Sequence, residues 1–285
     1  MSSIVATVVI PSYNAEADIA RVLEALDAQT LRDRIETLVV DNGSTDDTVA
    51  LAERLADRVA VVTEERGSGP ARNEGMRLTK TPLMLSLDSD CTPDADWAER
   101  HLARMAAEPQ TTLATAGRTL PAPSDDRWAR RADITPHPAF ENGDALYAVT
   151  GNACFRTEAL RELGGFPSLG ADDAALGLIA RERGYRFVWT PEAVVHHRNP
   201  VGWRGYARQM RKIGAYAIEM GGVPRSRFGF WLGQSRWLPS LGRHLVARRG
   251  HDALALVLAV GGKALGARDA WRRGRTLETT RGRSS

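Results

Sequence analysis

The sequence predicts an α/β fold whose mostly parallel sheet has helices on both faces. Three observations support this class. Apolar strand-like runs alternate with helical stretches over the first hundred residues, and this order is typical of a parallel sheet. The strand-like runs end in polar residues, as they do where ligands bind at the carboxyl ends of strands. The chain has 285 residues, 43% of them hydrophobic, which is enough for one large domain or for a domain with a tail.

The elements of the first half follow from the apolar spacing. Ile19, Val22, Leu23 and Leu26 recur at helical intervals, and Asp46 or Asp47 stands where it can cap the next helix. In chain order we expect a strand in 6–14, a helix in 17–28, a strand and turn in 36–48, a helix to 55, a strand in 58–65, a helix in 72–78 and a strand in 82–90.

The second half is less regular. Residues 118–142 are rich in proline and charge and predict a loop or a mobile segment. We then expect a strand, a turn and a helix in 147–166, a helix in 171–186 that stops at Gly184, and two short strands in 186–197. After Pro200 the chain is expected to be helical and basic.

Charge is distributed unevenly along the chain. Residues 201–285 contain 17 Lys and Arg against 4 Asp and Glu, a net charge of +13, whereas residues 1–200 contain 21 against 31, a net charge of −10. The acidic body and basic tail suggest an anionic surface as a partner of the tail. Nucleic acid is not expected, because no binding motif accompanies the charge.

The number of cysteines and the length of the apolar runs indicate where in the cell the protein is expected. Cys91 and Cys154 match no zinc spacing, and two cysteines in a chain of this length favour free thiols in a reducing compartment. We see no basic leader and no run of membrane-spanning length, and we expect 253–262 to be a packed helix. The expected location is the cytoplasm, or the inner face of its membrane.

A pair of acidic residues ends the fourth expected strand. Asp88 and Asp90, separated by Ser89, point to the same face if the strand continues through them. Two like charges at that distance repel each other unless a cation lies between them. The pattern therefore indicates either a divalent metal site or a solvated turn.

Five segments in order carry a family likeness. They are VVIPSYNAEADIARVLEAL, VVDNGSTDDT, GSGPARNEGM, the Asp88-Ser89-Asp90 triplet and the spaced pattern GGF, DD, L, R and G. Together they resemble glycosyltransferase family 2, the inverting enzymes of the GT-A fold, from about residue 4 to about residue 200. The resemblance implies a catalytic domain in 1–200, with a nucleotide-binding half in about 1–100 and an acceptor-binding half in about 143–200. A helical extension would occupy 201–273 and a disordered tail 274–285.

The resemblance implies that the first half binds the nucleotide of a sugar donor, most often a UDP-sugar. Pro11, Tyr13, Asn14 and Asp41 stand where the family binds nucleotide, and Asp41 would accept a hydrogen bond from the base. Arg72 would lie beside the base or the diphosphate, which a guanidinium suits. The alternatives are that Asp41 only caps its turn and that Arg72 is a surface residue at a helix start.

The resemblance also implies that the acidic triplet binds a metal. Asp90 would ligate Mn²⁺ or Mg²⁺, and Asp88 would contact the metal, through water, or the ribose. A histidine at the end of the following strand would complete the metal or diphosphate site, with His197 the better match than His196. The alternative is an exposed histidine pair at a strand end.

Two further segments are expected at the reaction centre. Asp172 and Asp173 stand where the family has an acidic pair, and the second member would be the general base that takes the proton of the acceptor hydroxyl. The alternative is an N-cap pair for the helix that follows. Gly151 and Asn152 would line the pocket between donor and acceptor.

The expected function is therefore metal-dependent transfer of a sugar to an acceptor hydroxyl with inversion. The acceptor would be a glycan, a lipid-linked compound or a small molecule, and the sequence names neither the sugar nor the oligomeric state. A sugar-nucleotide pyrophosphorylase would need a Gly-rich loop after the first strand, which PSYNAEAD is not, and the intact carboxylates argue against an inactive binding subunit.

The segment WRGYARQMRKIGAYAIE is expected to form an amphipathic helix. Its apolar stripe consists of Trp203, Tyr206, Met210, Ile213 and Ala217, and its basic stripe of Arg204, Arg208, Arg211 and Lys212. The helix is expected to lie either on the catalytic domain, with its basic side chains facing the acceptor cleft, or on an anionic membrane.

Overall fold

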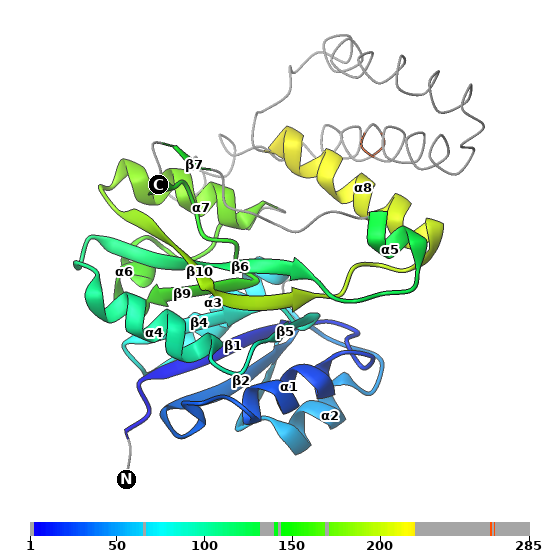
Figure 1. The fold of residues 1–285 in the computed structure, drawn as a ribbon, viewed down its shortest axis with the longest axis horizontal. Coiled ribbons are helices and arrows are strands. Elements are labelled where there is room, and N and C mark those ends of the chain that lie inside the picture. The colour runs from blue at the N-terminus through cyan, green and yellow to red at the C-terminus, as the bar shows by residue number, and fades with distance from the viewer. Residues whose placement is uncertain are drawn as a thin grey trace. The chain divides into compact units, whose positions relative to one another are not determined.

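The computed structural model describes residues 3–64, 67–131, 140–141, 144–168, 171–219, 263 and 265. The chain divides into two compact units, the first comprising Met1–Ala122, Ile134–Ser168 and Asp172–Arg198, and the second Pro123–Asp133, Leu169–Ala171 and Asn199–Ser285. The elements, labelled in Figure 1, are β1 (Ala6–Ser12), α1 (Ile19–Asp27), a 3₁₀ turn (Arg32–Arg34), β2 (Ile35–Asp41), α2 (Thr48–Leu55), β3 (Arg58–Val61), α3 (Ser68–Leu78), β4 (Leu83–Leu87), β5 (Cys91–Pro93), α4 (Trp97–Ala107), β6 (Thr112–Pro121), α5 (Arg127–Arg131), β7 (Phe140–Glu141), β8 (Asp144–Ala145), β9 (Asn152–Arg156), α6 (Thr157–Glu162), α7 (Asp172–Glu182), β10 (Arg186–His197) and α8 (Gly202–Glu219).

The first unit is built on one mixed sheet in which most of the paired residues lie in parallel ladders. The strand order is β3-β2-β1-β4-β9-β6-β10-β8-β7, and β5 pairs with β10 off this path. Strands β3, β2, β1 and β4 are parallel, as the alternation in the sequence predicts. Strand β9 runs antiparallel between β4 and β6, so its first residue lies at the edge where β4 ends.

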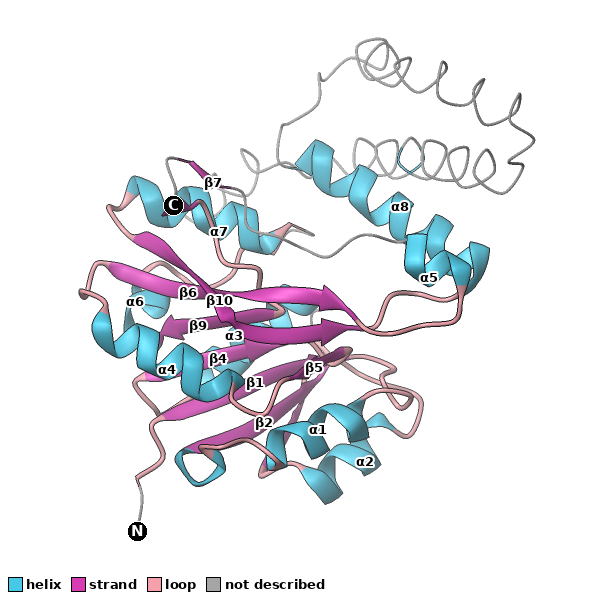
Figure 2. Ribbon diagram, viewed as in Figure 1, coloured by secondary structure: helices cyan, strands magenta, loops and turns pink. Residues whose placement is uncertain are grey.

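Apolar side chains on the two faces of the sheet form two cores. Figure 2 shows α1, α2 and α4 in front of the sheet. Val8 and Ile10 pack with residues of these helices, whereas Val9 packs with residues of α3, α6 and α7. This alternation has the period of two that a strand buried on both faces requires. Helix α3 packs closely on β1, since a Cβ at Gly75 would lie 2.2 Å from a methyl carbon of Val9.

A buried polar network around Asn152 joins β9 to its neighbours. The Asn152 Oδ1 atom accepts hydrogen bonds from Trp97 Nε1 at 2.7 Å and from His101 Nε2 at 3.0 Å. Its Nδ2 group donates to the carbonyl oxygens of Arg118 and Ala193. His101 Nδ1 in turn contacts Thr115 Oγ1 at 2.8 Å. Every polar atom of the Asn152 amide is therefore satisfied inside the protein, as a fully buried amide requires.

The described part of the second unit contains the helices α5 and α8. The rings of Trp128 and Tyr206 pack with their centroids 5.6 Å apart. Asp126 Oδ1 accepts hydrogen bonds from the backbone amides of Trp128 and Ala129 and from that of Gly202 at 3.2 Å. One carboxylate thus satisfies free amides at the beginning of both helices.

Several expectations for the second half are corrected by strand pairing. Part of 118–142, expected to be a loop, extends β6 to Pro121 and forms α5 and β7. The stretch 186–197 is one strand, β10, with a register shift between Thr190 and Val194, and not two strands. Helix α8 falls within the expected extension of 201–273, whereas the packed helix expected in 253–262 and the tail in 274–285 lie outside the described residues.

We predict that His101 makes the stability of the fold depend on pH. Burial lowers the pKa of its imidazole from 6.5 to about 4, although the hydrogen bond to Asn152 opposes this. The unfolded state then takes up a proton at a higher pH than the folded state does. The neutral His101 therefore contributes fully to the free energy of unfolding above about pH 6.5. This free energy falls by about 3 kcal/mol as the pH drops to about 4, because the unfolded state gains the proton.

The measurement is urea unfolding of the natural chain and of His101→Gln between pH 4 and pH 7. The variant should show a smaller loss of unfolding free energy over this range, whatever its stability at pH 7. Parallel curves for the two proteins would show that His101 is not held neutral in the fold.

Candidate active site

The parallel strands deliver several predicted residues to one edge of the sheet. Strands β1, β2 and β4 are neighbours that run in the same direction, so their carboxyl ends meet at one edge, which we call the carboxyl edge. Pro11 lies at the end of β1, Asp41 ends β2, and Asp88 follows β4. The start of the antiparallel β9, at Asn152, lies at the same edge.

Arg72 connects this edge to the acidic pair that begins α7. Its Nη2 atom lies 2.5 Å from Asp88 Oδ1, and its Nη1 atom lies 2.7 Å from Asp172 Oδ2. The side chains of Arg72 and Asp172 are only 4% and 5% exposed. Burial opposes the charge of the guanidinium, but Asp172 and Asp88 outweigh it and raise the pKa of Arg72. We expected Arg72 to lie beside a base or diphosphate, and the structure directs both of its terminal nitrogens to carboxylates.

Asp173 is the member of the acidic pair that is not in contact with Arg72. It is half-buried, and its Oδ1 atom accepts a hydrogen bond from the backbone amide of Ala174 at 2.7 Å. Burial and then the charge of Asp172 raise the pKa of Asp173 to about 7. Asp172, predicted with Asp173 as catalytic, is instead held in the ion pair with Arg72. A carboxylate with a pKa near neutrality is suited to exchange a proton with a bound hydroxyl group.

Asp90 faces His197 across the short pairing of β5 with β10. Asp90 Oδ2 and His197 Nε2 are 3.5 Å apart, because Cys91 and His197 are paired residues of the two antiparallel strands. Burial opposes ionisation of Asp90, but the hydrogen bond and charge of His197 outweigh burial and lower the pKa of Asp90. Asp88, two residues earlier, turns to Arg72 and is not part of this pair.

The donors of this pair fit a divalent cation. A carboxylate oxygen and an imidazole nitrogen at this separation can bind one ion, and the imidazole suits Mn²⁺ better than Mg²⁺. Within the described residues, no group of three or more His, Cys, Asp and Glu side chains is arranged to hold a metal. The protein would thus supply only part of the coordination, as is common where a substrate phosphate supplies the rest.

The two adjacent histidines of β10 have different surroundings. Successive residues of a strand point to opposite faces. His196 Nε2 lies 3.1 Å from Asp94 Oδ1, while His197 contacts Asp90. The geometry therefore favours His197 over His196 beside the acidic triplet.

Asp41 is fully buried and holds the turn that follows β2. Its Oδ1 atom accepts hydrogen bonds from the backbone amides of Gly43 and Ser44, and its Oδ2 atom accepts one from the Ser44 hydroxyl. We expected Asp41 to accept a hydrogen bond from a base. The structure assigns its carboxylate to the turn instead, which is the alternative that its sequence context also allowed.

The residues after β1 present a surface beside that turn. Tyr13 is 51% exposed, and Pro11 is buried. Asn14 has a φ of +49°, and its Oδ1 atom accepts a hydrogen bond from the backbone amide of Thr45 at 2.9 Å. Asn14 thus fastens the loop after β1 to the loop after β2, and Tyr13 is left as the exposed ring between them and solvent.

The two residues predicted to line the pocket between donor and acceptor have different positions. A Cβ at Gly151 would lie 2.6 Å from Asp88 Oδ2, so only glycine leaves room for that carboxylate. Asn152 cannot line a pocket, because its side chain is fully buried and bound to Trp97, His101 and backbone carbonyls. The prediction for Asn152 is therefore corrected.

Sequence reasoning missed Asp18 and Arg198. Asp18 Oδ1 forms an ion pair with Arg198 Nε at 3.1 Å and accepts a hydrogen bond from Arg21 Nη2 at 2.6 Å. The backbone amide of Arg198 donates to the backbone oxygen of Asp90 at 2.9 Å. No motif marks these residues. The only signal was that Arg198 directly follows the histidine pair.

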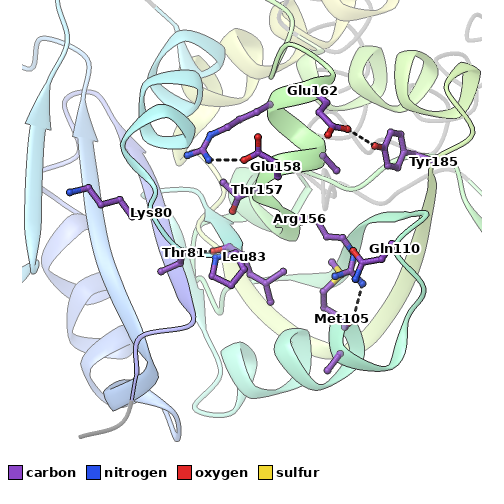
Figure 3. Close-up of a pocket in the computed structure, with 14 residues that line it drawn as sticks. Lys80, Thr81, Leu83, Met105, Gln110, Arg156, Thr157, Glu158, Glu162 and Tyr185 are labelled. Atoms are coloured by element: carbon purple, nitrogen blue, oxygen red, sulfur yellow. Dashed lines mark hydrogen bonds and ion pairs between the residues drawn. The ribbon is translucent and has the colours of Figure 1, made fainter.

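A cavity of about 780 Å³ lies at the opposite, amino-terminal edge of the sheet (Figure 3). Its lining includes Leu83 at the start of β4 and Arg156 at the end of the antiparallel β9. The guanidinium of Arg156 is bound to backbone carbonyls, among them that of Glu108 at 2.8 Å. This cavity is thus separate from the carboxylates of the candidate site.

Two other expectations concern thiols and membrane spans. Cys91 and Cys154 are buried and free, and burial raises the pKa of the Cys154 thiol to about 12. Among the helices that the structure describes, none has both the length and the apolar character needed to cross a membrane.

Comparisons with known proteins support the family likeness. The sequence profile described as glycosyl transferase family 2 matches residues 7–164. The glycosyltransferase AglE of Haloferax volcanii is 27% identical over 207 residues, which cover 69% of this chain and 68% of that protein. The O-antigen chain rhamnosyltransferase RfbN of Salmonella typhimurium is 26% identical over 208 residues, which cover 67% and 65%.

Solved structures share the fold. The mannosyltransferase PcManGT of Pyrobaculum calidifontis, in complex with GDP-Man and Mn²⁺, has a TM-score of 0.59 at 24% identity, over 94% of this chain and 74% of that one. S. aureus TarS 1–349, in complex with UDP-GlcNAc, has a TM-score of 0.58 at 16% identity, over 95% and 93%. The mixed sheet is thus that of the GT-A fold. From its sequence match and its fold, the chain belongs to glycosyl transferase family 2 and is a glycosyltransferase.

Proposed function

We propose that this glycosyltransferase moves a sugar from a nucleotide-sugar donor to an acceptor hydroxyl in a single displacement that inverts the anomeric centre. Asp173 acts as the general base. The observation that carries the proposal is the position of this half-buried carboxylate beside Asp172, which Arg72 joins to Asp88 at the carboxyl edge; burial and the charge of Asp172 raise its pKa to about 7. An acceptor hydroxyl becomes a good nucleophile only as its proton is removed in the transition state.

The surroundings of Asp173 support this role. Asp172 raises the pKa of Asp173, but Arg72 limits the rise because its charge acts on both carboxylates. Asp88 also raises the pKa of Asp173, which fits a position near the acidic triplet. A base near the donor site can take the hydroxyl proton as the oxygen attacks, and no covalent sugar–enzyme intermediate is then needed.

The donor would be held at the carboxyl edge. Tyr13 offers an exposed ring to a base, and the turn held by Asp41 forms the adjoining wall. Asp90 and His197 would hold Mn²⁺, or Mg²⁺ less well, and the cation would neutralise charge on the leaving diphosphate. We propose a UDP-sugar as donor. The relatives of known structure were solved with GDP-Man and with UDP-GlcNAc, so both nucleotides belong in the test.

The exposed side of α8 supports contact with an anionic membrane. Arg204, Arg208 and Lys212 are exposed, and no ion pair engages them within the described residues. Arg204 stacks over the ring of Trp203, which is 50% exposed, at 5.2 Å from its centroid. Cationic and aromatic side chains together are typical of helices that lie on anionic lipid. Such contact would place the enzyme near a lipid-linked acceptor.

Replacing the base tests the mechanism. We expect Asp173→Asn to lower turnover about 10²- to 10⁴-fold, since an amide cannot take the proton. Turnover is measured as release of nucleoside diphosphate from UDP- and GDP-sugars with Mn²⁺ present, water serving as acceptor. Calorimetry with UDP or GDP should show nearly unchanged binding. Glu53→Gln, which removes an exposed carboxylate of α2, is the matched control. Equal losses of binding and turnover would mean that Asp173 only supports the fold.

The rate should rise with pH through about 7. Below this pH Asp173 is protonated and cannot accept the proton, and above it the rate should level off. Asp172→Asn removes a charge that raises the pKa of Asp173, so the rise should move to lower pH. The measurement is turnover at saturating donor between pH 5 and pH 9. If turnover of Asp172→Asn rose at the same pH as that of the natural chain, Asp173 would not be the general base.

The membrane proposal is tested with vesicles. We expect the chain to sediment with phosphatidylglycerol vesicles at low salt and not with phosphatidylcholine vesicles. The triple change Arg204→Glu, Arg208→Glu and Lys212→Glu should abolish sedimentation. The control reverses three exposed charges of the first unit, Arg54→Glu, Lys80→Glu and Arg183→Glu, and should retain it. Equal losses in both triples would show that only net charge matters.

A further inference from the structure

Behind the Asp90–His197 pair lies a cluster of charged side chains that the proposed mechanism does not use. Asp18, at the N-terminus of α1, is 9% exposed. Its Oδ1 atom accepts a hydrogen bond from Arg21 and forms an ion pair with Arg198, as described above. Arg21 belongs to α1 itself, whereas Arg198 belongs to the end of β10. The two arginines share one oxygen but come from different parts of the fold.

Arg198 joins three segments at one point. Its side chain reaches Asp18 on α1, and its backbone amide binds the carbonyl of Asp90 in the turn after β4. Its preceding neighbour in the chain is His197. Arg198 is thus hydrogen-bonded to Asp90 through its backbone, and it follows His197 directly in the chain.

The pairing that places Asp90 beside His197 is short. Strand β5 has three residues, and its register with β10 ends at the pair of Cys91 and His197. Asp90 lies just beyond this last pair, where a ladder of this length is free to open. The backbone hydrogen bond between Arg198 and Asp90 follows directly after this last pair. The ion pair with Asp18 holds Arg198 against α1.

We infer that the ion pair of Asp18 with Arg198 is a positioning element that holds Asp90 and His197 at the separation needed to share one divalent cation. This inference rests on the proposed role of Asp90 and His197. Asp18 is not treated as a third ligand, because the described residues contain no three-member group arranged for a metal. Groups that orient ligands in this way change metal affinity about 10- to 100-fold when removed.

The experiment measures Mn²⁺ affinity of the full chain by electron paramagnetic resonance, with UDP present, because the protein supplies only part of the coordination and a phosphate supplies the rest. Arg198→Ala keeps the backbone amide and removes the ion pair, and it should weaken affinity at least about 10-fold. Arg21→Ala removes the other partner of the same Asp18 oxygen, and should leave the affinity within about twofold, because Arg21 lies on α1 and its ion pair does not join α1 to β10. Arg198→Lys keeps a cation near Asp18 and should recover most of the affinity.

A spectroscopic readout separates positioning from general loss of structure. Electron spin-echo modulation from an imidazole nitrogen should be present in the natural chain with Mn²⁺. It should be lost in Arg198→Ala, since His197 would no longer reach an ion held by Asp90. A thermal unfolding curve for each variant shows whether it is folded, and Arg198→Lys supplies the comparison if Arg198→Ala is not.

Two reference variants, Asp90→Ala and His197→Ala, distinguish the ways of failing. If both abolish Mn²⁺ binding while folded Arg198→Ala binds as the natural chain does, the positioning role is overturned and the metal pair stands. If neither reference changes binding, or the natural chain binds no Mn²⁺ with UDP present, the metal pair is wrong and the positioning role falls with it. Loss in Arg198→Ala with retention in Arg21→Ala supports the inference.

Discussion

The arrangement of the site depends on one buried cation. Arg72 contacts Asp88 and Asp172, which are separated by more than eighty residues in the chain, and it lies close enough to Asp173 to affect its pKa. Without this charge, three carboxylates from two segments would repel one another in a region that excludes water. Removing one partner of a buried ion pair typically lowers the free energy of unfolding by about 3–5 kcal/mol. The two ion pairs of Arg72 therefore also hold α3, α7 and the end of β4 together.

The same cation separates the roles of two adjacent acids. Asp172 is paired with Arg72 and is only 3% exposed, whereas Asp173 has no such direct partner within the described residues. Burial raises the pKa of both carboxyl groups, and the charge of Arg72 opposes the rise in each. The two acids therefore differ in their contacts: the oxygens of Asp172 are engaged by the guanidinium and by the backbone amide of Asp173, whereas Asp173 does not touch the guanidinium.

Polar residues at the carboxyl edge serve either the fold or the site, and the two uses look alike in sequence. Asp41 and Asn152 both stand at strand ends beside predicted ligand positions, yet both are fully buried and engaged by protein groups. A buried amide or carboxylate must find its partners inside the protein, and these two do. Their contribution to the site is indirect, because they fix the turn after β2 and the start of β9 beside Asp88.

The sequence by itself determined the alternation of strands and helices, the edge at which polar residues gather, and the residue types of the reaction centre. These features depend on local periodicity and on motifs that each lie in one segment. It did not determine that Arg72 faces carboxylates, that β9 runs antiparallel beside β4, or that Arg198 meets Asp18. Those contacts join segments that are distant in the chain. Only the tertiary structure decides them, because a side chain's partners and burial, and hence its pKa, depend on what the rest of the fold brings to it.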